Sequence, residues 1–220
     1  MTQPDVRQPQ VDRMGPQACV LRGAALSGMP DLLSGLERIL AMAPFRLMVT
    51  PGGKTMSVAL TNCGALGWTS DHRGYRYTGQ DPVTGQAWPS MPQAFLRLAN
   101  RWAREAGFAG FLPDACLINR YQPGTRLSLH QDRNEQDFGA PIVSVSLGAP
   151  AVFLFGGPLR SDRPARVLLE HGDVAVWGGV DRLRFHGVMP LKVIEENLFP
   201  SIPHPLLRGQ RINLTFRKAG

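Results

Sequence analysis

After Gly110 the chain consists of short runs of strand-forming residues separated by Gly and Pro, and this pattern constrains the fold more than any other. The runs are three to seven residues long and rich in branched aliphatic and aromatic side chains, as strands usually are. Eight such runs at this spacing favour a sandwich or a jelly roll. We expect strands at 115–121, 126–131, 142–147, 152–155, 167–169, 174–177, 183–187 and 212–216.

Two amphipathic segments in the first half predict helices. Between Asp31 and Ala43, apolar residues recur at helical spacing and form one stripe. The sequence from Ser90 to Gln93 resembles a capping box, and we expect it to open a second helix that Gly107 ends. With the strands that follow, the pattern predicts a mainly β chain with flanking helices, of the α+β class.

Length and termini limit the organisation of the chain. The 220 residues suit one domain, or one domain with an elaboration, and 43% hydrophobic residues suffice for a sizeable core. Residues 1–16 are polar and rich in Pro and Gln, which predicts a disordered tail and neither a signal peptide nor a membrane span. Three widely spaced cysteines without a Cys-x-x-Cys motif argue against a disulfide framework or a zinc site, and favour a cytoplasmic protein.

The charge balance points to a class of partner. The chain carries a formal net charge of +7 and has a pI near 10.0. Such an excess favours polyanionic partners, through long-range attraction and counterion release. Charge alone does not say which polyanion is bound, so the chemistry must come from individual residues.

The most informative of these residues are His130, Asp132 and His186. His130 and Asp132 are two positions apart, so on a strand both project from one face. Two imidazoles and one carboxylate bind one face of an octahedral Fe(II) ion and leave three positions open for an oxidant and a co-substrate. A lone His-x-Asp is more often a surface pair or a core histidine, so this interpretation needs further support.

A polar strand near the C-terminus adds that support. Read as a strand, residues 211–217 place Ile212, Leu214 and Phe216 on one face and polar side chains, including two arginines, on the other. An edge strand with its polar face in water is one interpretation. If the polar face instead points inward, the guanidinium groups need an anion, because unpaired buried charge is costly. A dicarboxylate ligand would supply it.

These motifs together resemble the bacterial AlkB proteins, which are Fe(II)- and 2-oxoglutarate-dependent repair dioxygenases. The resemblance runs in order from about Leu21 to Gly220 and implies a double-stranded β-helix, or jelly roll, with an N-terminal nucleotide-recognition lid. It implies three parts: the tail at 1–16, an extension with the lid at 17–110, and the catalytic core at 111–220. The residues that carry it are His130-x-Asp132, His186, Arg211-x-Asn213-Leu-Thr-Phe-Arg217, Asn119-Arg-Tyr121, Thr50-Pro-Gly-Gly53 and Thr61-Asn-Cys-Gly64.

The resemblance also assigns the co-substrate site. It implies that His130, Asp132 and His186 are the catalytic iron ligands, and that dioxygen and 2-oxoglutarate are consumed there. The residues that would hold 2-oxoglutarate are Asn119, Tyr121, Arg211, Asn213 and Arg217, with Arg211 forming the salt bridge to the distal carboxylate. A planar guanidinium fork suits a carboxylate better than a lysine ammonium does.

The implied reaction is oxidative demethylation of N-alkylated bases such as 1-methyladenine and 3-methylcytosine. The alkyl group is hydroxylated and lost as formaldehyde, while 2-oxoglutarate becomes succinate and carbon dioxide. The implied substrate is alkylated DNA, preferably single-stranded, with RNA left open. We also expect a monomer that does not associate with membranes.

Substrate contacts are carried over to four positions. Trp68 and Tyr75 match aromatic positions that stack on an extruded base or contact the substrate backbone, and Arg160 matches another contact position. Asn134 stands where the best-matched members carry an Asp beside the methylated base, which leaves the preference among bases open. The segment 192–210 is also longer than the family pattern predicts.

Two other functions remain open from the sequence. One is a 2-oxoglutarate-dependent dioxygenase acting on a protein or a small molecule, and the other is a catalytically silent nucleic-acid-binding module. The intact His-x-Asp and His set argues against the silent module. The aromatic and basic segment 67–79 argues against the small-molecule enzyme.

Overall fold

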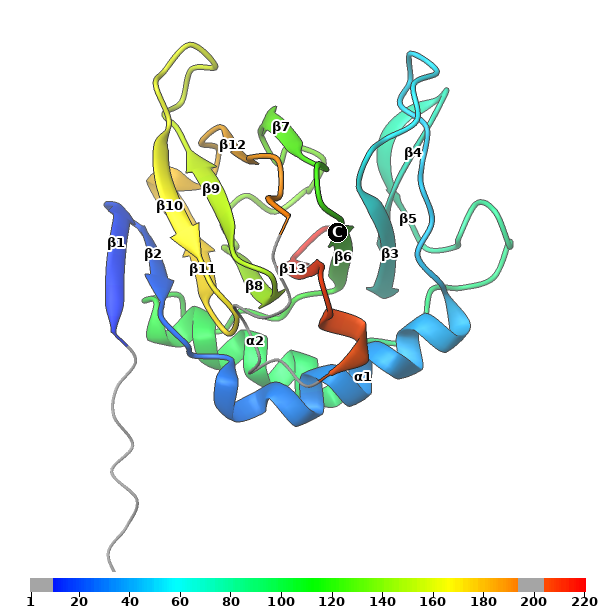
Figure 1. The fold of residues 1–220 in the computed structure, drawn as a ribbon, viewed down its shortest axis with the longest axis horizontal. Coiled ribbons are helices and arrows are strands. Elements are labelled where there is room, and N and C mark those ends of the chain that lie inside the picture. Colours follow the sequence, from blue (N-terminus) through cyan, green and yellow to red (C-terminus); the bar gives the residue numbers. More distant parts are fainter. Residues whose placement is uncertain (1–9, 194–203) are drawn as a thin grey trace, which may run out of the picture.

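The computed structural model describes residues 10–193 and 204–220 as two facing sheets with helices on one side (Figure 1). The larger sheet has seven strands in the order β1-β2-β11-β8-β13-β6-β3, and the smaller has four in the order β10-β9-β12-β7. All pairings between named strands are antiparallel. This architecture confirms the jelly-roll prediction.

The elements are short, as expected for this fold. The helices are α1 (Met29–Met42) and α2 (Gln93–Glu105), with single 3-10 turns at η1 (Leu26–Gly28), η2 (Gly179–Asp181) and η4 (Pro205–Leu207). The strands are β1 (Val11–Gly15), β2 (Ala18–Leu21), β3 (Ala59–Gly64), β4 (Gly67–Asp71), β5 (Gly74–Thr78), β6 (Ala115–Tyr121), β7 (Leu127–His130), β8 (Ile142–Gly148), β9 (Ala151–Phe155), β10 (Ala165–Leu169), β11 (Val174–Trp177), β12 (His186–Val188) and β13 (Arg211–Arg217).

Two hydrophobic layers hold the elements together. One lies between the larger sheet and the two helices, where Phe95 and Trp102 of α2 pack near Phe216 of β13. The other lies between the two sheets and includes Phe153 and Trp177. β13 is an interior strand of the larger sheet. One of its faces therefore packs toward the helices, and the other faces the space between the two sheets.

The polar face of β13 points inward. All seven residues of the strand are buried, and it pairs with β8 on one side and β6 on the other. Its apolar residues join the helix-side core, while Arg211, Asn213, Thr215 and Arg217 line a cavity between the sheets. The interpretation of this segment as a solvated edge strand is therefore wrong.

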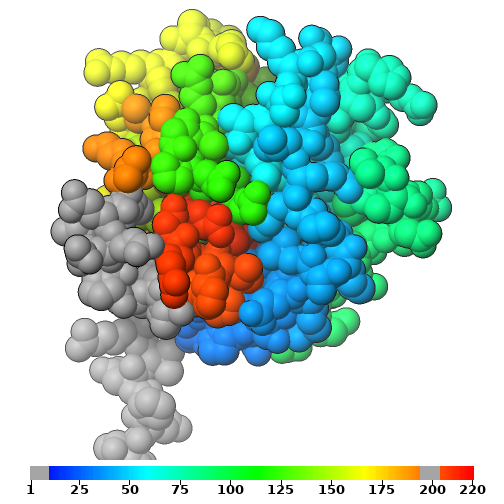
Figure 2. Space-filling model, turned by 45° about the vertical axis from the view of Figure 1, so that its right-hand side comes forward, coloured from blue at the N-terminus to red at the C-terminus, as the bar shows by residue number. Residues whose placement is uncertain are grey.

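Segments far apart in sequence meet around this cavity. Figure 2 shows the blue and cyan N-terminal part of the chain against the green segment near β7 and the red C-terminal segment. The Ser57 hydroxyl donates to the carbonyl oxygen of Arg126 across this junction at 3.2 Å. Among the residues that the structure describes, no helix is both long and apolar enough to cross a membrane.

Two details of the sequence analysis need correction. The tail predicted at 1–16 is too long, because Val11–Gly15 forms β1 and pairs with β2 at the edge of the larger sheet. Residues 1–9 lie outside the described part of the chain. The capping box is also wrong: α2 begins at Gln93, and its N-cap is Pro92, without a side-chain cap. A proline disfavours helical backbone in the residue before it, so Met91 is kept out of the helix.

Candidate active site

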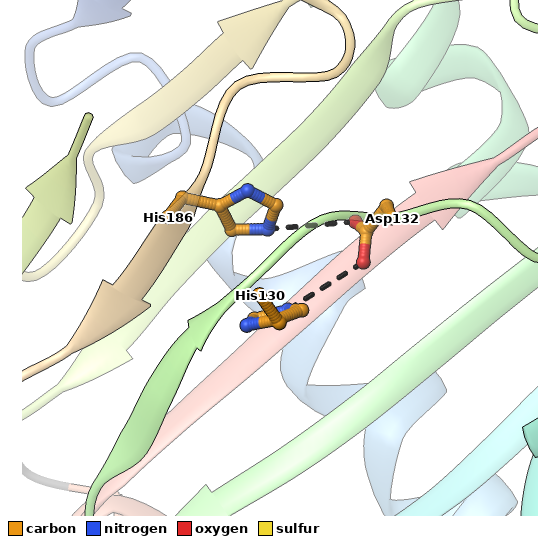
Figure 3. A group of neighbouring side chains, drawn as sticks. All are labelled: His130, Asp132 and His186. Atoms are coloured by element: carbon orange, nitrogen blue, oxygen red, sulfur yellow. Dashed lines mark ion pairs between the residues drawn. The ribbon is translucent and has the colours of Figure 1, made fainter. Parts of the chain in front are cut away.

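Three side chains converge where β7 and β12 run side by side (Figure 3). His130 ends β7 and faces His186, the first residue of β12, as its register partner. Asp132 follows β7 by two residues, and its carboxylate oxygens lie 3.5 Å from His130 Nε2 and 3.6 Å from His186 Nε2. One potential ligand atom from each residue lies within 4.8 Å of the others. This is the donor set and spacing that a two-histidine, one-carboxylate iron site needs.

Hydrogen bonds orient both imidazole rings for metal binding. His130 Nδ1 lies 2.9 Å from the carbonyl oxygen of Ser128, and His186 Nδ1 lies 3.0 Å from that of Arg184. A carbonyl oxygen only accepts, so each Nδ1 carries the proton, which leaves the Nε2 lone pairs directed at Asp132. Burial, followed by the charge of His130, lowers the pKa of His186, and this favours the neutral, ligating form.

Asp132 is held as a carboxylate. Its Oδ2 accepts from Arg217 Nε at 3.0 Å and from Arg217 Nη2 at 2.7 Å. Burial alone would raise the pKa of Asp132, but the charge of Arg217, together with the two nearby histidines, holds it well below its usual range. Burial lowers the pKa of His130, but the neighbouring Asp132 carboxylate raises it by more, so the net shift is upward.

A cavity of about 470 Å³ extends from these three residues into the space between the sheets. Asn119 and Tyr121 of β6 and the polar face of β13 also line it. Burial raises the pKa of Tyr121 to about 12, so the phenol is neutral there. The five residues predicted to hold the co-substrate therefore lie on one cavity.

Arg211 differs from its polar neighbours on β13 because two of its donors are unused. The side chain is 2% exposed, and Nη2 donates to Ser146 Oγ at 2.9 Å. Nε and Nη1 are buried and find no hydrogen-bond partner among the described residues. Burial lowers the pKa of Arg211 to about 10, which still leaves it charged at neutral pH. A buried cation with free donors in a cavity fits the distal carboxylate of a dicarboxylate.

The other polar groups of β13 are already engaged. Asn213 Nδ2 donates to Ser144 Oγ and to the Val145 carbonyl, both at 2.8 Å, and its Oδ1 accepts from Thr215 at 2.8 Å. Arg217 is bound to Asp132. Sequence reasoning missed Ser144 and Ser146, which hold Asn213 and Arg211. Their signal was a polar residue at every second position of an otherwise apolar strand.

The opposite side of the cavity is aromatic. The rings of Trp68 and Tyr75, across the β4–β5 hairpin, stack with centroids 5.5 Å apart and an interplanar angle of 15°. Asn134 joins them: its Oδ1 accepts from Trp68 Nε1 and its Nδ2 donates to the Tyr75 carbonyl, both at 3.4 Å. All three residues line the same cavity as His130.

Arg160 is placed differently from the other predicted substrate residues. It is not among the cavity-lining residues, and it donates from Nη1 to the Leu129 carbonyl at 2.7 Å, with its guanidinium 5.9 Å from the centre of the Phe185 ring. It therefore lies beside β7 at the outer surface. The long segment 192–210 cannot be placed around the cavity, because residues 194–203 lie outside the described part of the chain.

A jelly roll with two histidines and a carboxylate between its sheets, joined by one cavity to a buried arginine with free donors, defines a non-haem Fe(II) dioxygenase with a dicarboxylate co-substrate. Comparison with known families agrees. The family model described as the 2OG-Fe(II) oxygenase superfamily matches residues 27–217.

Individual relatives narrow this class. The chain is 54% identical over 211 residues to the alpha-ketoglutarate-dependent dioxygenase AlkB of Salmonella typhimurium, covering 96% of this chain and 94% of that protein. The Escherichia coli protein of the same name is 53% identical over 213 residues, covering 97% and 95%. The solved structure of OsALKBH1 matches with a TM-score of 0.77 at 28% identity, covering 95% of this chain and 100% of that one. The chain belongs to the AlkB family of Fe(II)- and 2-oxoglutarate-dependent dioxygenases.

Proposed function

We propose that this enzyme removes alkyl groups oxidatively from N-alkylated nucleic-acid bases, with 1-methyladenine and 3-methylcytosine as substrates. The observation that carries the proposal is one cavity lined by the three candidate metal ligands, by Arg211 and by the stacked rings of Trp68 and Tyr75. A dicarboxylate and a flat aromatic base can thus reach the same metal from different sides.

His130, Asp132 and His186 are the proposed ligands of Fe(II), which with 2-oxoglutarate and dioxygen supplies the oxidation that hydroxylates the N-alkyl group. Arg211 binds the distal carboxylate, Asn119 and Tyr121 bind the co-substrate from β6, and Asn213 and Arg217 complete the pocket. Arg217 also keeps Asp132 ionised. The hydroxylated group leaves as formaldehyde, and the co-substrate leaves as succinate and carbon dioxide.

Trp68 is the proposed surface on which an extruded base stacks, Tyr75 is a proposed contact to the substrate backbone, and the β4–β5 hairpin that carries them is the proposed lid. Arg160 at the outer surface is a proposed phosphate contact. Extruding a base requires less energy from a single strand than from a duplex, so we propose single-stranded DNA as the preferred substrate, with RNA accepted. We further propose that the enzyme acts as a monomer in the cytoplasm.

A comparison of three classes of methylated substrate tests the proposal. The enzyme, loaded with Fe(II) and 2-oxoglutarate, is offered a methylated oligonucleotide, a methylated peptide and free methylated nucleosides, and the products are weighed by mass spectrometry. Loss of the methyl group from the oligonucleotide supports the proposal. Demethylation of the peptide or nucleosides alone would favour a protein or small-molecule substrate.

Binding to oligonucleotides is expected to be mostly electrostatic. Arg73, Arg133 and Arg160 are exposed basic residues, so affinity should fall steeply with salt, with a log–log slope set by the number of phosphates neutralised. Replacing Arg133 with Gln should reduce the slope by about one phosphate. Arg38→Gln on α1, at the far side of the larger sheet, is the matched control and should leave the slope unchanged. An oligonucleotide affinity that does not change with salt concentration would contradict the proposed nucleic-acid substrate.

Asn134 is expected to influence the choice of lesion. Its neutral amide bridges Trp68 and Tyr75 at the cavity, so Asn134→Asp places a negative charge beside the bound base. The kcat/KM for cationic 1-methyladenine and 3-methylcytosine should rise relative to neutral ethenoadenine, by about 1 kcal/mol or several-fold. Both lesions are compared side by side in one oligonucleotide. Equal changes for both would show that Asn134 does not face the base.

A further inference from the structure

The candidate metal ligand Asp132 belongs to a buried cluster of four charged residues. The cluster contains Asp132, Glu135, Arg182 and Arg217, and each is at most 8% exposed. Two carboxylates and two guanidinium groups balance in charge, which is what makes such burial tolerable. Glu135 and Arg182 are neither candidate metal ligands nor cavity-lining residues, so their burial requires another explanation.

Glu135 is the residue to which the rest of the cluster connects. Its Oε1 lies 3.3 Å from Arg217 Nε, and its Oε2 lies 3.3 Å from Arg182 Nη2. Oε1 also accepts a hydrogen bond of 2.7 Å from the hydroxyl of Tyr77. Oε2 has no hydrogen bond within the described chain, so the contact with Arg182 is an ion pair without good hydrogen-bond geometry.

The two arginines paired with Glu135 hold Asp132 in two different ways. Arg217 donates twice to the carboxylate oxygen Oδ2 of Asp132. Arg182 donates from Nη1 to the main-chain carbonyl of Asp132 at 3.0 Å, and from Nε to the Ala140 carbonyl at 3.1 Å. Glu135 thus fixes both the side chain and the backbone of Asp132 without touching the metal site itself.

Tyr77 connects this cluster to the aromatic side of the cavity. It lies on β5 and is the register partner of Trp68 on β4, two residues after Tyr75. Burial raises the pKa of Tyr77 well above its usual value, so its hydroxyl keeps the proton that it donates to Glu135. The β4–β5 hairpin is therefore bonded to the cluster by a part-buried hydrogen bond from Tyr77 to Glu135, close to its two cavity-lining aromatic rings.

We propose that Glu135 is a positioning residue that couples the base-binding hairpin to the metal ligand Asp132 through Tyr77 and Arg217. Binding of a base between the hairpin and the metal site orders the hairpin, which fixes Tyr77, Glu135 and Arg217 and so favours the ligating position of Asp132. The metal and the nucleic acid then strengthen each other's binding by the same factor, since coupling between two sites is reciprocal. This inference rests on the proposed function, because it requires an oligonucleotide at the hairpin.

The decisive variant is Tyr77→Phe, which removes one hydroxyl and keeps the ring and all four charges. The affinity for Mn(II), in the presence of 2-oxoglutarate, is measured by calorimetry with and without a saturating single-stranded oligonucleotide that contains 1-methyladenine. In the unmodified enzyme we expect the oligonucleotide to tighten Mn(II) binding about fivefold or more. In Tyr77→Phe this factor should fall below about twofold, while Mn(II) affinity without the oligonucleotide stays within about twofold of the unmodified enzyme.

Two further variants separate coupling from general stability. Asp71→Asn breaks the 2.6 Å ion pair with Arg76 on the same hairpin but leaves Tyr77 and Glu135 bonded, so it should retain the full coupling factor. Glu135→Gln removes the anion between the two arginines and should weaken Mn(II) binding both with and without the oligonucleotide. If Glu135→Gln fails to fold, as a variant with one uncompensated buried cation can, Tyr77→Phe still tests the coupling.

The possible failures are distinguishable. An oligonucleotide that does not bind to the loaded enzyme at all would overturn the proposed function and this inference with it. An oligonucleotide that binds, but tightens Mn(II) binding equally in the unmodified enzyme and in Tyr77→Phe, would overturn the inference alone. An oligonucleotide that binds to the unmodified enzyme without changing its affinity for Mn(II) would also overturn the inference alone.

Discussion

Replacing any one of His130, Asp132 and His186 with alanine is expected to abolish iron-dependent turnover. The three side chains converge from β7, the segment after it and β12, and they are the described residues that can supply a two-histidine, one-carboxylate site. Losing one of three ligands removes most of the affinity for the metal, since even residues that only orient ligands are worth about 10- to 100-fold. Asp132→Ala should be the most disruptive, because it also leaves Arg217 without its closest carboxylate partner.

The measurement pairs metal binding with product formation. Each variant is titrated with Fe(II) under anaerobic conditions to measure metal affinity. Succinate formed from 2-oxoglutarate is then quantified after air is admitted. His204→Asn is the matched control: this histidine pairs with Glu37 and caps η4, and asparagine retains a capping side chain. Full succinate production by any alanine variant would remove that residue from the ligand set.

Replacing Arg211 with alanine is expected to weaken 2-oxoglutarate binding by a large factor while the fold survives. A lost charge-assisted bidentate pair costs about 2–5 kcal/mol, which corresponds to about 30-fold to several thousand-fold in affinity. The fold should tolerate the change, because Arg211 makes one side-chain hydrogen bond, to Ser146, and its remaining donors are unused. Arg211→Lys keeps the charge but lacks the planar fork, so its affinity for 2-oxoglutarate should lie between those of the unmodified enzyme and Arg211→Ala.

Calorimetry with 2-oxoglutarate measures this effect, and Arg208→Ala, an exposed arginine near the start of β13, is the control. Oligonucleotide binding by Arg211→Ala should be nearly intact, because Arg211 pairs with one end of β6, whereas the hairpin follows β3 where β3 pairs with the other end of β6. Burial lowers the pKa of Arg211 to about 10, so unmodified enzyme should lose co-substrate affinity as the pH rises through the pKa of this group in the complex. An unchanged affinity in Arg211→Ala would mean that another residue binds the distal carboxylate.

The strands of the catalytic half were predictable because their alternation and turn residues are local signals. The segments 115–121 and 174–177 are strands with those bounds, and the separation of a polar from an apolar face in 211–217 follows from period-two alternation, whereas only the fold shows that the polar face points inward. The strand predicted at 183–187 begins only at His186, because the chain first turns through η2.

The N-terminal strands were not predictable in the same way. Residues 11–15 are exposed or half-buried, so their polar composition resembles a tail, and only pairing with β2 makes them a strand. The hairpin at 67–78 has few apolar residues on either face, and its aromatic rings contact residues from other parts of the chain. Tertiary pairing, rather than local preference, decides such segments.

Within the site, the resemblance predicted different roles for Arg211 and Arg217, but the local sequence pattern did not explain the difference. Arg211 and Arg217 share one face of one strand, and nothing local separates them. The fold does, because the segment 132–135 supplies carboxylates to Arg217, whereas Arg211 meets only a serine hydroxyl. The importance of Glu135 was likewise invisible, since its partners Tyr77, Arg182 and Arg217 are distant in sequence.

The central claim is that oxidation of 2-oxoglutarate at this site is coupled to repair of an alkylated base. The direct test is anaerobic reconstitution with Fe(II), 2-oxoglutarate and an oligonucleotide carrying 1-methyladenine, followed by admission of air and mass spectrometry of all products. We expect one succinate and one formaldehyde for each base that loses its methyl group, with little succinate when the oligonucleotide is unmethylated. Succinate formed at the same rate with either oligonucleotide, together with an unchanged methylated base, would contradict the account.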